Sequence, residues 1–385
     1  MTIDLQPARV RRQAIPVLAA TMLPVLCLLL WHPWNATMGD LRVYHAAARA
    51  FVHGQDIYTI PGLGLGFTYP PFAALLFAPF ALGAGFARVL ITLASAASLL
   101  VIGWTTARAL RWGPLAAVGI AFAALAFEPV WSTFGLGQIN LVLLALLMPA
   151  LVGRTRFRGV LIGVATGIKL TPGIFILYLL MTRRFREAAI ACGTTAGTLL
   201  LAYVVMPRAT IDFWTKYVFD PSRPGPPHYI SNQSLHGAIA RLSGNSAVPL
   251  WLLTATVVGV AGLLIARRLH DRGLEFDAVV VTALTGLLVS PISWTGHWVW
   301  IVPATALAWS RCSAVLSWRT AWAVVLTAVF VTGLPWWLPF AHDQEFHYNA
   351  VQTVVANAYL LCAVGLIGQA LNSDARIRYT WRVRS

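Results

Sequence analysis

Residues 38–71 read MGDLRVYHAAARAFVHGQDIYTIPGLGLGFTYPP and form a hydrophilic segment between two long apolar runs. From Leu41 onward, apolar side chains recur at helical spacing on one face, and basic side chains recur on the other. The apolar face holds Leu41, Tyr44, Ala48, Phe51 and Val52, and the basic face holds Arg42, His45, Arg49 and His53. We therefore expect an amphipathic helix that starts near Asp40, lies flat at a membrane surface and ends before Gly54.

The composition indicates a helical membrane protein. Of the 385 residues, 58% are hydrophobic and only 11% are charged, whereas a soluble domain carries about 25% charged residues. Apolar runs recur from end to end of the chain, and helices satisfy their own backbone hydrogen bonds in lipid. We predict an all-α polytopic fold in a single domain, residues 1–385, with about 10–12 transmembrane helices.

The net charge of +15 indicates membrane topology and not a nucleic-acid partner. The basic residues gather in short segments between the apolar runs, as in cytoplasmic loops. Arg9, Arg11 and Arg12 place the N-terminus in the cytoplasm, and the basic tail 372–385 places the C-terminus there too. We predict a multi-pass protein of the plasma (inner) membrane that contacts membrane lipids.

The four cysteines stand in apolar runs without metal-binding spacing. We therefore expect them to be small buried hydrophobic side chains.

Hydropathy gives a set of full spans and leaves two segments open. The expected spans are 15–34, 86–107, 114–128, 138–152, 188–206, 248–266, 277–290, 298–310, 320–334 and 350–371. Segments 70–82 and 159–181 either cross fully, or form a partial insertion and a re-entrant hairpin of two half-length helices. The hairpin alternative keeps all the arginine-rich segments on one side, so the positive-inside rule favours it.

In this topology the polar loops collect on the outer side of the membrane. The first periplasmic loop is 37–70 and contains the amphipathic helix, and a long periplasmic loop spans 207–248. Most of the polar side chains that could do chemistry fall in these outer segments. We therefore place the active site on the periplasmic side.

Lys169 lies in the middle of the expected hairpin, in Gly167-Ile168-Lys169-Leu170-Thr171-Pro172-Gly173. Pro172 breaks a helix, and a broken helix at membrane depth is tolerated where it lines a cavity. A cation there costs about 2.5–3.5 kcal/mol to insert. Lys169 could reach an interface or pair with Glu128, but a phosphate is the more informative partner, because helix ends and a fixed cation suit an anion.

Asp40 has two compatible interpretations at the start of the amphipathic helix. It is either the N-cap, accepting backbone N–H groups, or a catalytic base close to the lipid boundary. A capping carboxylate that accepts hydrogen bonds would have a lowered pKa. We take Asp40 as the leading candidate for the chemistry.

Aromatic and amide side chains in the outer segments suit a sugar. Trp294 and Trp298 flank His297 and form either an interface belt or a sugar-stacking wall. The amides Gln138, Asn140, Asn232 and Gln233 suit sugar hydroxyl groups. Asn232-Gln233-Ser234 also matches an N-glycosylation acceptor, a weak three-letter signal.

Several nucleotide and hydrolase motifs are absent from the sequence. It contains no G-x-S-x-G, Walker motif, dinucleotide fingerprint or H-E-x-x-H. It also contains no acidic D-x-D cluster, which argues against a metal-bound nucleotide sugar as donor. We predict neither a metal nor a cofactor.

Six short motifs in order resemble one family. They are Asp40 after the first span, Tyr69-Pro70-Pro71-Phe72, Gly137-Gln138-Ile139-Asn140, Lys169-Leu170-Thr171-Pro172, Asn232-Gln233-Ser234-Leu235 and Ser290-Pro291-Ile292-Ser293-Trp294 with His297-Trp298. Together they look like the actinobacterial glycosyltransferases of family 87, which have a GT-C fold. The resemblance implies polyprenol-phosphate-mannose as donor and α-1,2-linked mannose in phosphatidylinositol mannosides, lipomannan and lipoarabinomannan. It also implies a glycolipid acceptor.

The resemblance assigns roles to some of these residues. Asp40 matches the family's catalytic aspartate, and His297 matches a histidine that faces the donor. A phosphate leaving group needs no general acid, so the reaction requires a base for the acceptor hydroxyl and cations for the phosphate. From the residues themselves we add Lys169, Arg42, His53 and Tyr69 as candidates for the donor phosphate. Single displacement on a β-linked donor gives an α product.

Two alternatives stay open from the sequence. A transporter or flippase of lipid-linked sugars would suit the broken helix and the buried lysine, although no inverted repeat is visible. Within enzymes, an arabinofuranosyltransferase that uses polyprenyl-phosphate-arabinose is the near neighbour.

Overall fold

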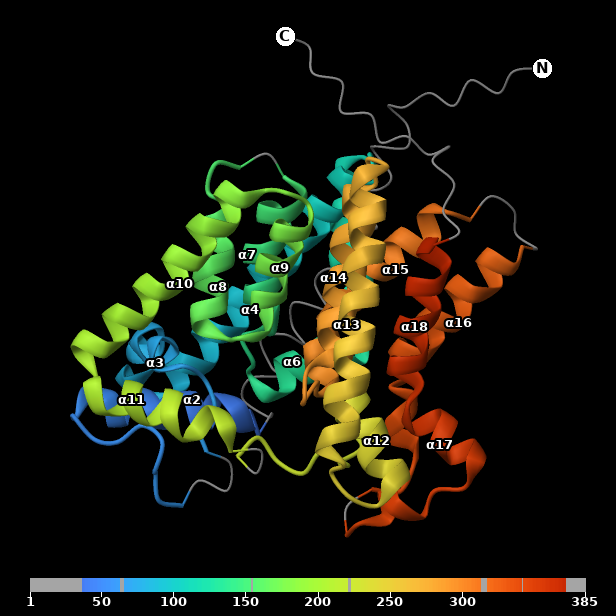
Figure 1. Ribbon diagram of the computed structural model, residues 1–385. Helices are drawn as coiled ribbons and strands as arrows, with labels where there is room; N and C mark the ends of the chain where they lie inside the picture. The colour runs from blue at the N-terminus through green and yellow to red at the C-terminus, as the bar shows by residue number, and fades with distance from the viewer. Residues whose placement is uncertain are drawn as a thin grey trace.

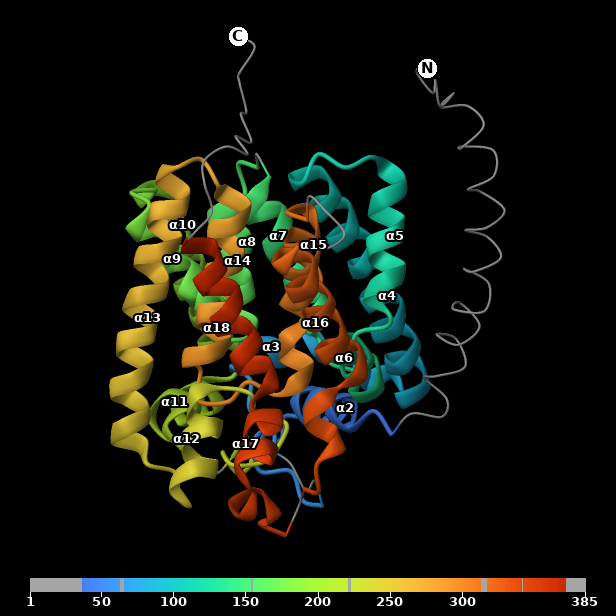
Figure 2. The ribbon, with the colours of Figure 1, turned by 90° about the vertical axis from the view of Figure 1, so that its right-hand side faces the viewer.

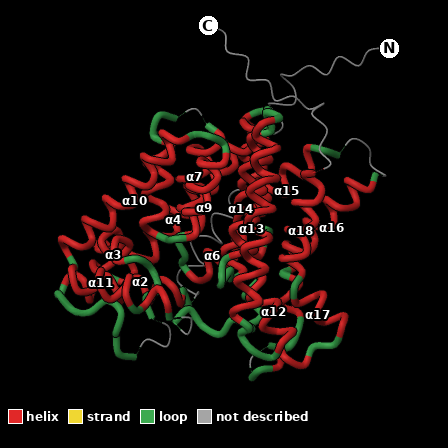
Figure 3. Tube along the Cα trace, viewed as in Figure 1, coloured by secondary structure: helices red, strands yellow, loops and turns green. Residues whose placement is uncertain are grey.

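The computed structural model describes residues 37–62, 66–153, 155–220, 223–312, 317–340 and 342–371. These residues form helices and loops without a β-strand (Figure 3), apart from an isolated antiparallel bridge between Asn232 and Trp294. The all-α prediction is thus confirmed for the described part of the chain. The expected first span 15–34 and the basic tail 372–385 lie outside the described residues.

The helices follow one another with short connections (Figure 1). The α-helices are α2 (Gly39–Val52), α3 (Pro71–Phe77), α4 (Ala84–Ala109), α5 (Pro114–Ala124), α6 (Glu128–Leu136), α7 (Asn140–Val152), α8 (Arg158–Ile168), α9 (Ile174–Met181), α10 (Phe185–Val205), α11 (Pro207–Thr215), α12 (Leu235–Ser243), α13 (Val248–Asp271), α14 (Glu275–Val289), α15 (Ile301–Ser310), α16 (Trp318–Thr332), α17 (Ala350–Ala356) and α18 (Ala358–Leu371). The short 3-10 helices are η1 (Ala78–Leu82), η2 (Thr171–Gly173), η3 (Tyr217–Phe219), η4 (Thr295–Trp300), η5 (Leu334–Trp337) and η6 (Gln344–His347).

Three described helices, α4, α10 and α13, are each long and apolar enough to cross a membrane alone. Two bent pairs, α5 with α6 and α17 with α18, would raise this number to five. The first pair corrects the expected span 114–128, because α5 ends at Ala124 and α6 turns by 68°. The bend has a local cause: Pro129 has no N–H and cannot continue the preceding helix.

Arginine-rich helix ends gather at one end of the molecule (Figures 1 and 2). The helices α4, α7, α9, α13 and α15 all end there, and α5, α8, α10, α14 and α16 all begin there. These helix termini carry Arg108, Arg158, Arg186, Arg267, Arg268 and Arg319. We call this the arginine end. The helices α2, α11, α12 and α17 lie at the opposite end.

The segment 159–181 is the expected hairpin. Helix α8 leaves the arginine end, Lys169 interrupts it with extended backbone angles (φ −147°, ψ 132°), and α9 returns. The break falls three positions before the expected Pro172, which instead lies in the one-turn helix η2. The tip of a half-length hairpin therefore carries Lys169 into the interior of the helix assembly.

Glycines fix the position of this hairpin against α10. Gly159, Gly163 and Gly167 recur every four residues on α8 and face α10. A Cβ on Gly163 would lie 2.5 Å from Thr194 Cβ, and one on Gly167 would lie 2.2 Å from Thr198 Oγ1. Small residues at this spacing let two helix backbones approach closely in a membrane. The glycines therefore set the distance between α8 and α10.

Helix α2 forms where the residue spacing predicted a helix starting near Asp40. It buries Leu41, Tyr44 and Ala48 as predicted, while Arg42 is exposed. Val52 departs from the expected apolar face and is 57% exposed. The helix ends in a Schellman motif: Gly54 has φ +66°, and the N–H of the following residue bonds to the carbonyl oxygen of Ala50 at 2.8 Å.

An arginine clasp ties the first loop to the segment that follows α11. Arg223 donates from Nη2 to the carbonyl oxygens of Tyr58 (3.1 Å) and Phe67 (3.0 Å). Its guanidinium also lies 4.2 Å from the ring centre of Tyr217. The Tyr58 hydroxyl in turn donates to the Tyr69 carbonyl oxygen at 2.8 Å. The clasp thereby holds the chain leading to Tyr69.

Candidate active site

Side chains from four separate segments meet beside the hairpin tip. Asp40 comes from the first turn of α2, Gln138 and Asn140 from the turn between α6 and α7, Lys169 from the hairpin break, and His297 from η4. The contacts join residues up to 128 positions apart in the chain. Of the predicted site residues, hydrogen bonds connect these five.

Hydrogen bonds join these side chains into one continuous series. Gln138 Nε2 donates to Asp40 Oδ2, and Asn140 Nδ2 donates to Gln138 Oε1. Lys169 Nζ donates to Asn140 Oδ1 at 3.0 Å. A carboxylate and an amino group are thus connected through two amides.

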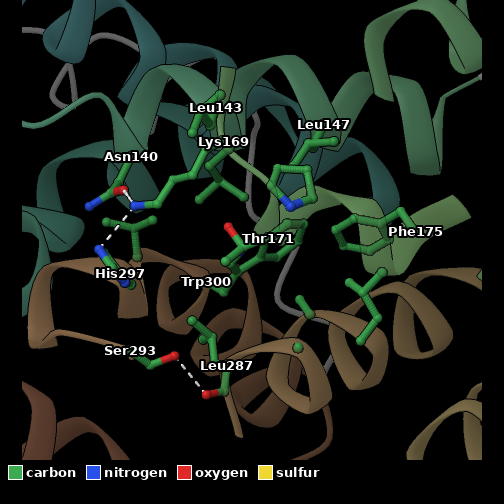
Figure 4. Close-up of a pocket in the computed structure, with 16 residues that line it drawn as sticks. Asn140, Leu143, Leu147, Lys169, Thr171, Phe175, Leu287, Ser293, His297 and Trp300 are labelled. Carbon is green, nitrogen blue, oxygen red and sulfur yellow. Dashed lines mark hydrogen bonds between the residues drawn. The ribbon is translucent and has the colours of Figure 1, made fainter. Parts of the chain in front are cut away.

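Lys169 and His297 form the far end of the series (Figure 4). Lys169 Nζ lies 2.9 Å from His297 Nε2. A protonated lysine can only donate, which assigns Nε2 as the acceptor and leaves a neutral imidazole with its proton on Nδ1. In this arrangement the neutral His297 orients Lys169 and is not a second cation beside it.

The aromatic ring of Tyr69 lies beside the Lys169 amino group. Its ring centre lies 5.4 Å from Lys169 Nζ, a cation–π distance. Its hydroxyl pairs with the Tyr44 hydroxyl at 2.7 Å, and both tyrosines are buried. The contact with Lys169 is consistent with the prediction that Tyr69 lies near the donor phosphate. The residue spacing placed Tyr44 only on the apolar face of the helix. Its position one helical turn after Asp40 could have indicated that it lies beside the site.

Asp40 is not the N-cap that one interpretation expected. The N-cap of α2 is Met38, which makes no side-chain capping bond, and the Asp40 carboxylate accepts from Gln138 instead. Burial raises the pKa of the Asp40 carboxyl, although the Gln138 hydrogen bond and the Lys169 charge oppose the rise. The expected lowering of the pKa by capping is therefore wrong, and a raised value suits a base.

A cavity of about 60 Å³ lies beside Lys169, between polar and apolar side chains (Figure 4). Its polar head is formed by Asn140, Lys169, Ser293 and His297. The remaining wall is mostly apolar and comes from α7, α9, α14 and the end of η4, and includes Leu143, Leu147, Phe175, Leu287 and Trp300. A cation in the lining of a largely apolar cavity suits an anionic headgroup on an apolar chain.

Two predicted phosphate ligands lie outside the cluster. Arg42 is exposed on α2. His53 is also exposed, and its Nδ1 lies 2.7 Å from the Arg49 carbonyl oxygen. Glu128, the alternative partner for Lys169, instead accepts from Trp336 (3.1 Å) and Tyr359 (2.9 Å).

Three of the predicted acceptor ligands support the site instead of lining it. Asn232 donates to the carbonyl oxygens of Pro227 (2.9 Å) and Pro291 (3.2 Å) and accepts from Ser293 N (2.9 Å). Gln233 donates to the carbonyl oxygens of Ile230 (2.8 Å) and Ala356 (2.7 Å). Trp298 is fully buried against Phe330 and Tyr359. These contacts correct the expected sugar-binding role of the three side chains, because their polar atoms or faces are already occupied.

Trp294 is the predicted aromatic that keeps an accessible surface. It is partly exposed and packs edge-on against Tyr229, with ring centres 6.1 Å apart. It stands three residues before His297 and carries the bridge to Asn232.

Among the described residues, no group of three or more His, Cys, Asp or Glu side chains comes together as a metal site.

The sequence matches one enzyme family. The sequence model of glycosyltransferase family 87 matches residues 67–291. This range includes Gln138, Asn140 and Lys169 and ends before His297.

Similar curated proteins extend over more of the chain. One is the polyprenol-phosphate-mannose-dependent alpha-(1-2)-phosphatidylinositol mannoside mannosyltransferase of Mycobacterium tuberculosis (strain ATCC 25618 / H37Rv), 36% identical over an alignment of 318 residues; the match covers 74% of this chain and 74% of the relative. Another is the corresponding phosphatidylinositol pentamannoside mannosyltransferase of M. tuberculosis (strain CDC 1551 / Oshkosh), 35% identical over an alignment of 359 residues; the match covers 88% of this chain and 81% of the relative.

Among solved structures, ArnT from Cupriavidus metallidurans bound to undecaprenyl phosphate aligns with a TM-score of 0.43 at 17% identity. The alignment covers 91% of this chain and 77% of that one.

Proposed function

The chain belongs to glycosyltransferase family 87, and from that membership we propose that it transfers mannose from polyprenol-phosphate-mannose to a mannosylated phosphatidylinositol acceptor in α-1,2 linkage. The observation that carries the proposal is the series from Asp40 to Lys169 beside a largely apolar cavity. One end of this series suits a base, and the other suits a phosphate.

Asp40 is the proposed general base. In the reaction the acceptor hydroxyl oxygen attacks the anomeric carbon, and the bond from that carbon to the phosphate oxygen breaks. The hydroxyl proton passes to the carboxylate, and the bonding electrons leave with the prenyl phosphate. A positioned base typically contributes about 10²–10⁴-fold to the rate. A single displacement inverts the anomeric centre, so a β-linked donor gives an α product.

Lys169 is the proposed phosphate ligand. Its amino group has three N–H donors, of which the structure uses one for Asn140 and one for His297. The third can meet a phosphate oxygen and stabilise the charge that develops there. The apolar wall beyond Lys169 suits the first isoprene units of the donor.

We further propose that the arginine end faces the cytoplasm and the opposite end faces the periplasm. The arginine-rich helix termini at one end support this orientation under the positive-inside rule. A lipid-linked donor needs no soluble nucleotide sugar, which suits a periplasmic site.

The test uses purified protein with polyprenyl-phosphate-mannose and a panel of mannosylated lipid acceptors. We expect transfer of mannose and a fall of about 10²–10⁴-fold in kcat for Asp40→Asn. Asp56→Asn is the matched control, because Asp56 is an exposed acid in the same loop that only caps Tyr58 N and Thr59. Wild-type turnover by Asp40→Asn would refute the base.

A second variant tests the phosphate. Lys169→Met keeps an unbranched side chain that is one atom shorter and removes the charge, so we expect a raised KM for the donor. An unchanged donor KM would remove the phosphate role. No product with any acceptor would favour a flippase, and turnover of the arabinose donor alone would indicate an arabinofuranosyltransferase.

A further inference from the structure

The two amides between Asp40 and Lys169 have a fixed orientation. Asn140 Nδ2 contacts the Gly296 carbonyl oxygen at 2.9 Å, and a carbonyl oxygen can only accept. Lys169 Nζ can only donate, so it must face Asn140 Oδ1, as it does at 3.0 Å. Both contacts agree on which amide atom is nitrogen.

The same reasoning orients Gln138. The Asp40 carboxylate can only accept, so the Gln138 atom beside it is the nitrogen, and Oε1 receives the proton of Asn140 Nδ2. Every donor in the series therefore points from Lys169 toward Asp40. Hydrogen bonds aligned in one direction polarise one another in a low-dielectric interior.

Both amides are buried. Gln138 is 4% exposed and Asn140 is 6% exposed, whereas Asp40, Lys169 and His297 keep larger accessible fractions. Their polar atoms are engaged with each other and with Gly296. A direct role in acceptor binding, as the sequence suggested, does not fit this burial.

We propose that Gln138 and Asn140 are positioning residues that form a polarised amide bridge. The bridge aims the Asp40 carboxylate at the acceptor hydroxyl. It also couples that carboxylate to the proposed phosphate site at Lys169. This inference rests on the proposed function. The terminal torsion of an aspartate is broad, so a carboxylate without such a partner would rotate. Gln138 holds Oδ2, and the proposal assigns Oδ1 to the acceptor hydroxyl.

Asn140→Asp breaks the bridge at its centre without changing its shape. The new carboxylate still accepts from Lys169 but cannot donate to Gln138 or Gly296. We expect kcat to fall about 10–100-fold, with the donor KM within about threefold because the Lys169 contact is kept. The acid limb of the pH–rate profile should also move to higher pH, because a new anion lies near Asp40.

Thr133→Val is the matched control. Thr133 is buried, and its hydroxyl donates to the same Gly296 carbonyl oxygen at 3.1 Å without bonding to either amide side chain. Its carbonyl oxygen accepts from Gln138 N at 2.9 Å, and valine keeps that backbone bond. It removes a hydrogen bond at η4 and leaves the series intact. We expect a kcat within about threefold of wild type.

Gln138→Met supplies a second break that adds no charge. It removes the donor to Asp40, so kcat should fall by a similar factor and the acid limb should again move to higher pH. A purely structural role would lower the yield or the thermal midpoint without moving the limb. If folded Asn140→Asp or Gln138→Met keeps wild-type kcat and an unmoved acid limb, the bridge is refuted.

The outcome separates this inference from the proposed function. If wild-type protein transfers no mannose, the proposed function fails. If it transfers mannose and Asp40→Asn abolishes transfer while both bridge variants remain fully active, only the bridge fails.

Discussion

The contact between α8 and α10 makes Gly163→Ala an informative perturbation. A methyl group on Gly163 would lie 2.5 Å from Thr194 Cβ and 2.6 Å from the Ala191 carbonyl oxygen. Carbon atoms pack at about 3.5–4.0 Å, so the two helices must separate by about 1 Å here, from 3.5 minus 2.5. Overpacking of this kind costs about 1–3 kcal/mol of unfolding free energy.

The same separation should reach the chemistry. Helix α8 ends at Ile168, and the next residue is Lys169. A displacement of about 1 Å at a catalytic group can lower the rate on the order of 100-fold. We therefore expect Gly163→Ala to lower both the thermal midpoint and kcat.

Gly193→Ala is the matched control for this prediction. Gly193 lies on α10, and nothing approaches within 4 Å of its added Cβ. Alanine is favoured over glycine in a helix by about 1 kcal/mol, so this variant should be neutral or slightly stabilised. The assay is thermal unfolding of both purified variants in one detergent, followed by tryptophan fluorescence. An equal or higher midpoint for Gly163→Ala would refute the packing argument.

Three further predictions concern charge, the clasp and the buried amides. Because burial raises the pKa of Asp40, kcat/KM should be lost on the acid side at a higher pH than for an exposed aspartate. The same raised pKa stabilises the fold below the ordinary value of 3.8, and that contribution is lost as pH rises through the folded-state pKa. Asp40→Asn should therefore be at least as stable as wild type at neutral pH; a lower thermal midpoint would contradict this. Arg223→Gln removes two hydrogen bonds from a cation, each worth about 1.5–3 kcal/mol. Limited proteolysis should cut the first loop faster than in the exposed control Arg208→Gln, and equal rates would contradict the clasp. Asn232→Ala strands buried backbone groups at about 1–3 kcal/mol each, so its midpoint should fall well below that of the exposed control Asn245→Ala.

Features that depend on local sequence were predictable. The amphipathic α2 follows from residue spacing between 41 and 53, and its end follows from Gly54. The hairpin followed from arginines at both ends and a helix breaker between them, although the break lies at Lys169. The bend between α5 and α6 was missed because hydropathy continues through Phe127 while the backbone turns.

Most of the site could be named from the sequence but not assembled. Asp40, Gln138, Asn140, Lys169 and His297 all came from short motifs. Their contacts span up to 128 positions, and no local pattern specifies which side chains meet across such distances. Arg223 gave no signal, because its role depends on two backbone carbonyl oxygens from another loop.

The sequence by itself determined that this is a multi-pass helical membrane protein, because hydropathy and the position of arginines are properties of each segment alone. Only the tertiary structure decided what its amides do. Gln138 and Asn232 are the same kind of residue in similar short motifs. One bonds to a carboxylate and the other to backbone carbonyl oxygens. The physical reason is that a hydrogen bond depends on the partner that folding places within about 3 Å, and that partner comes from a distant part of the chain.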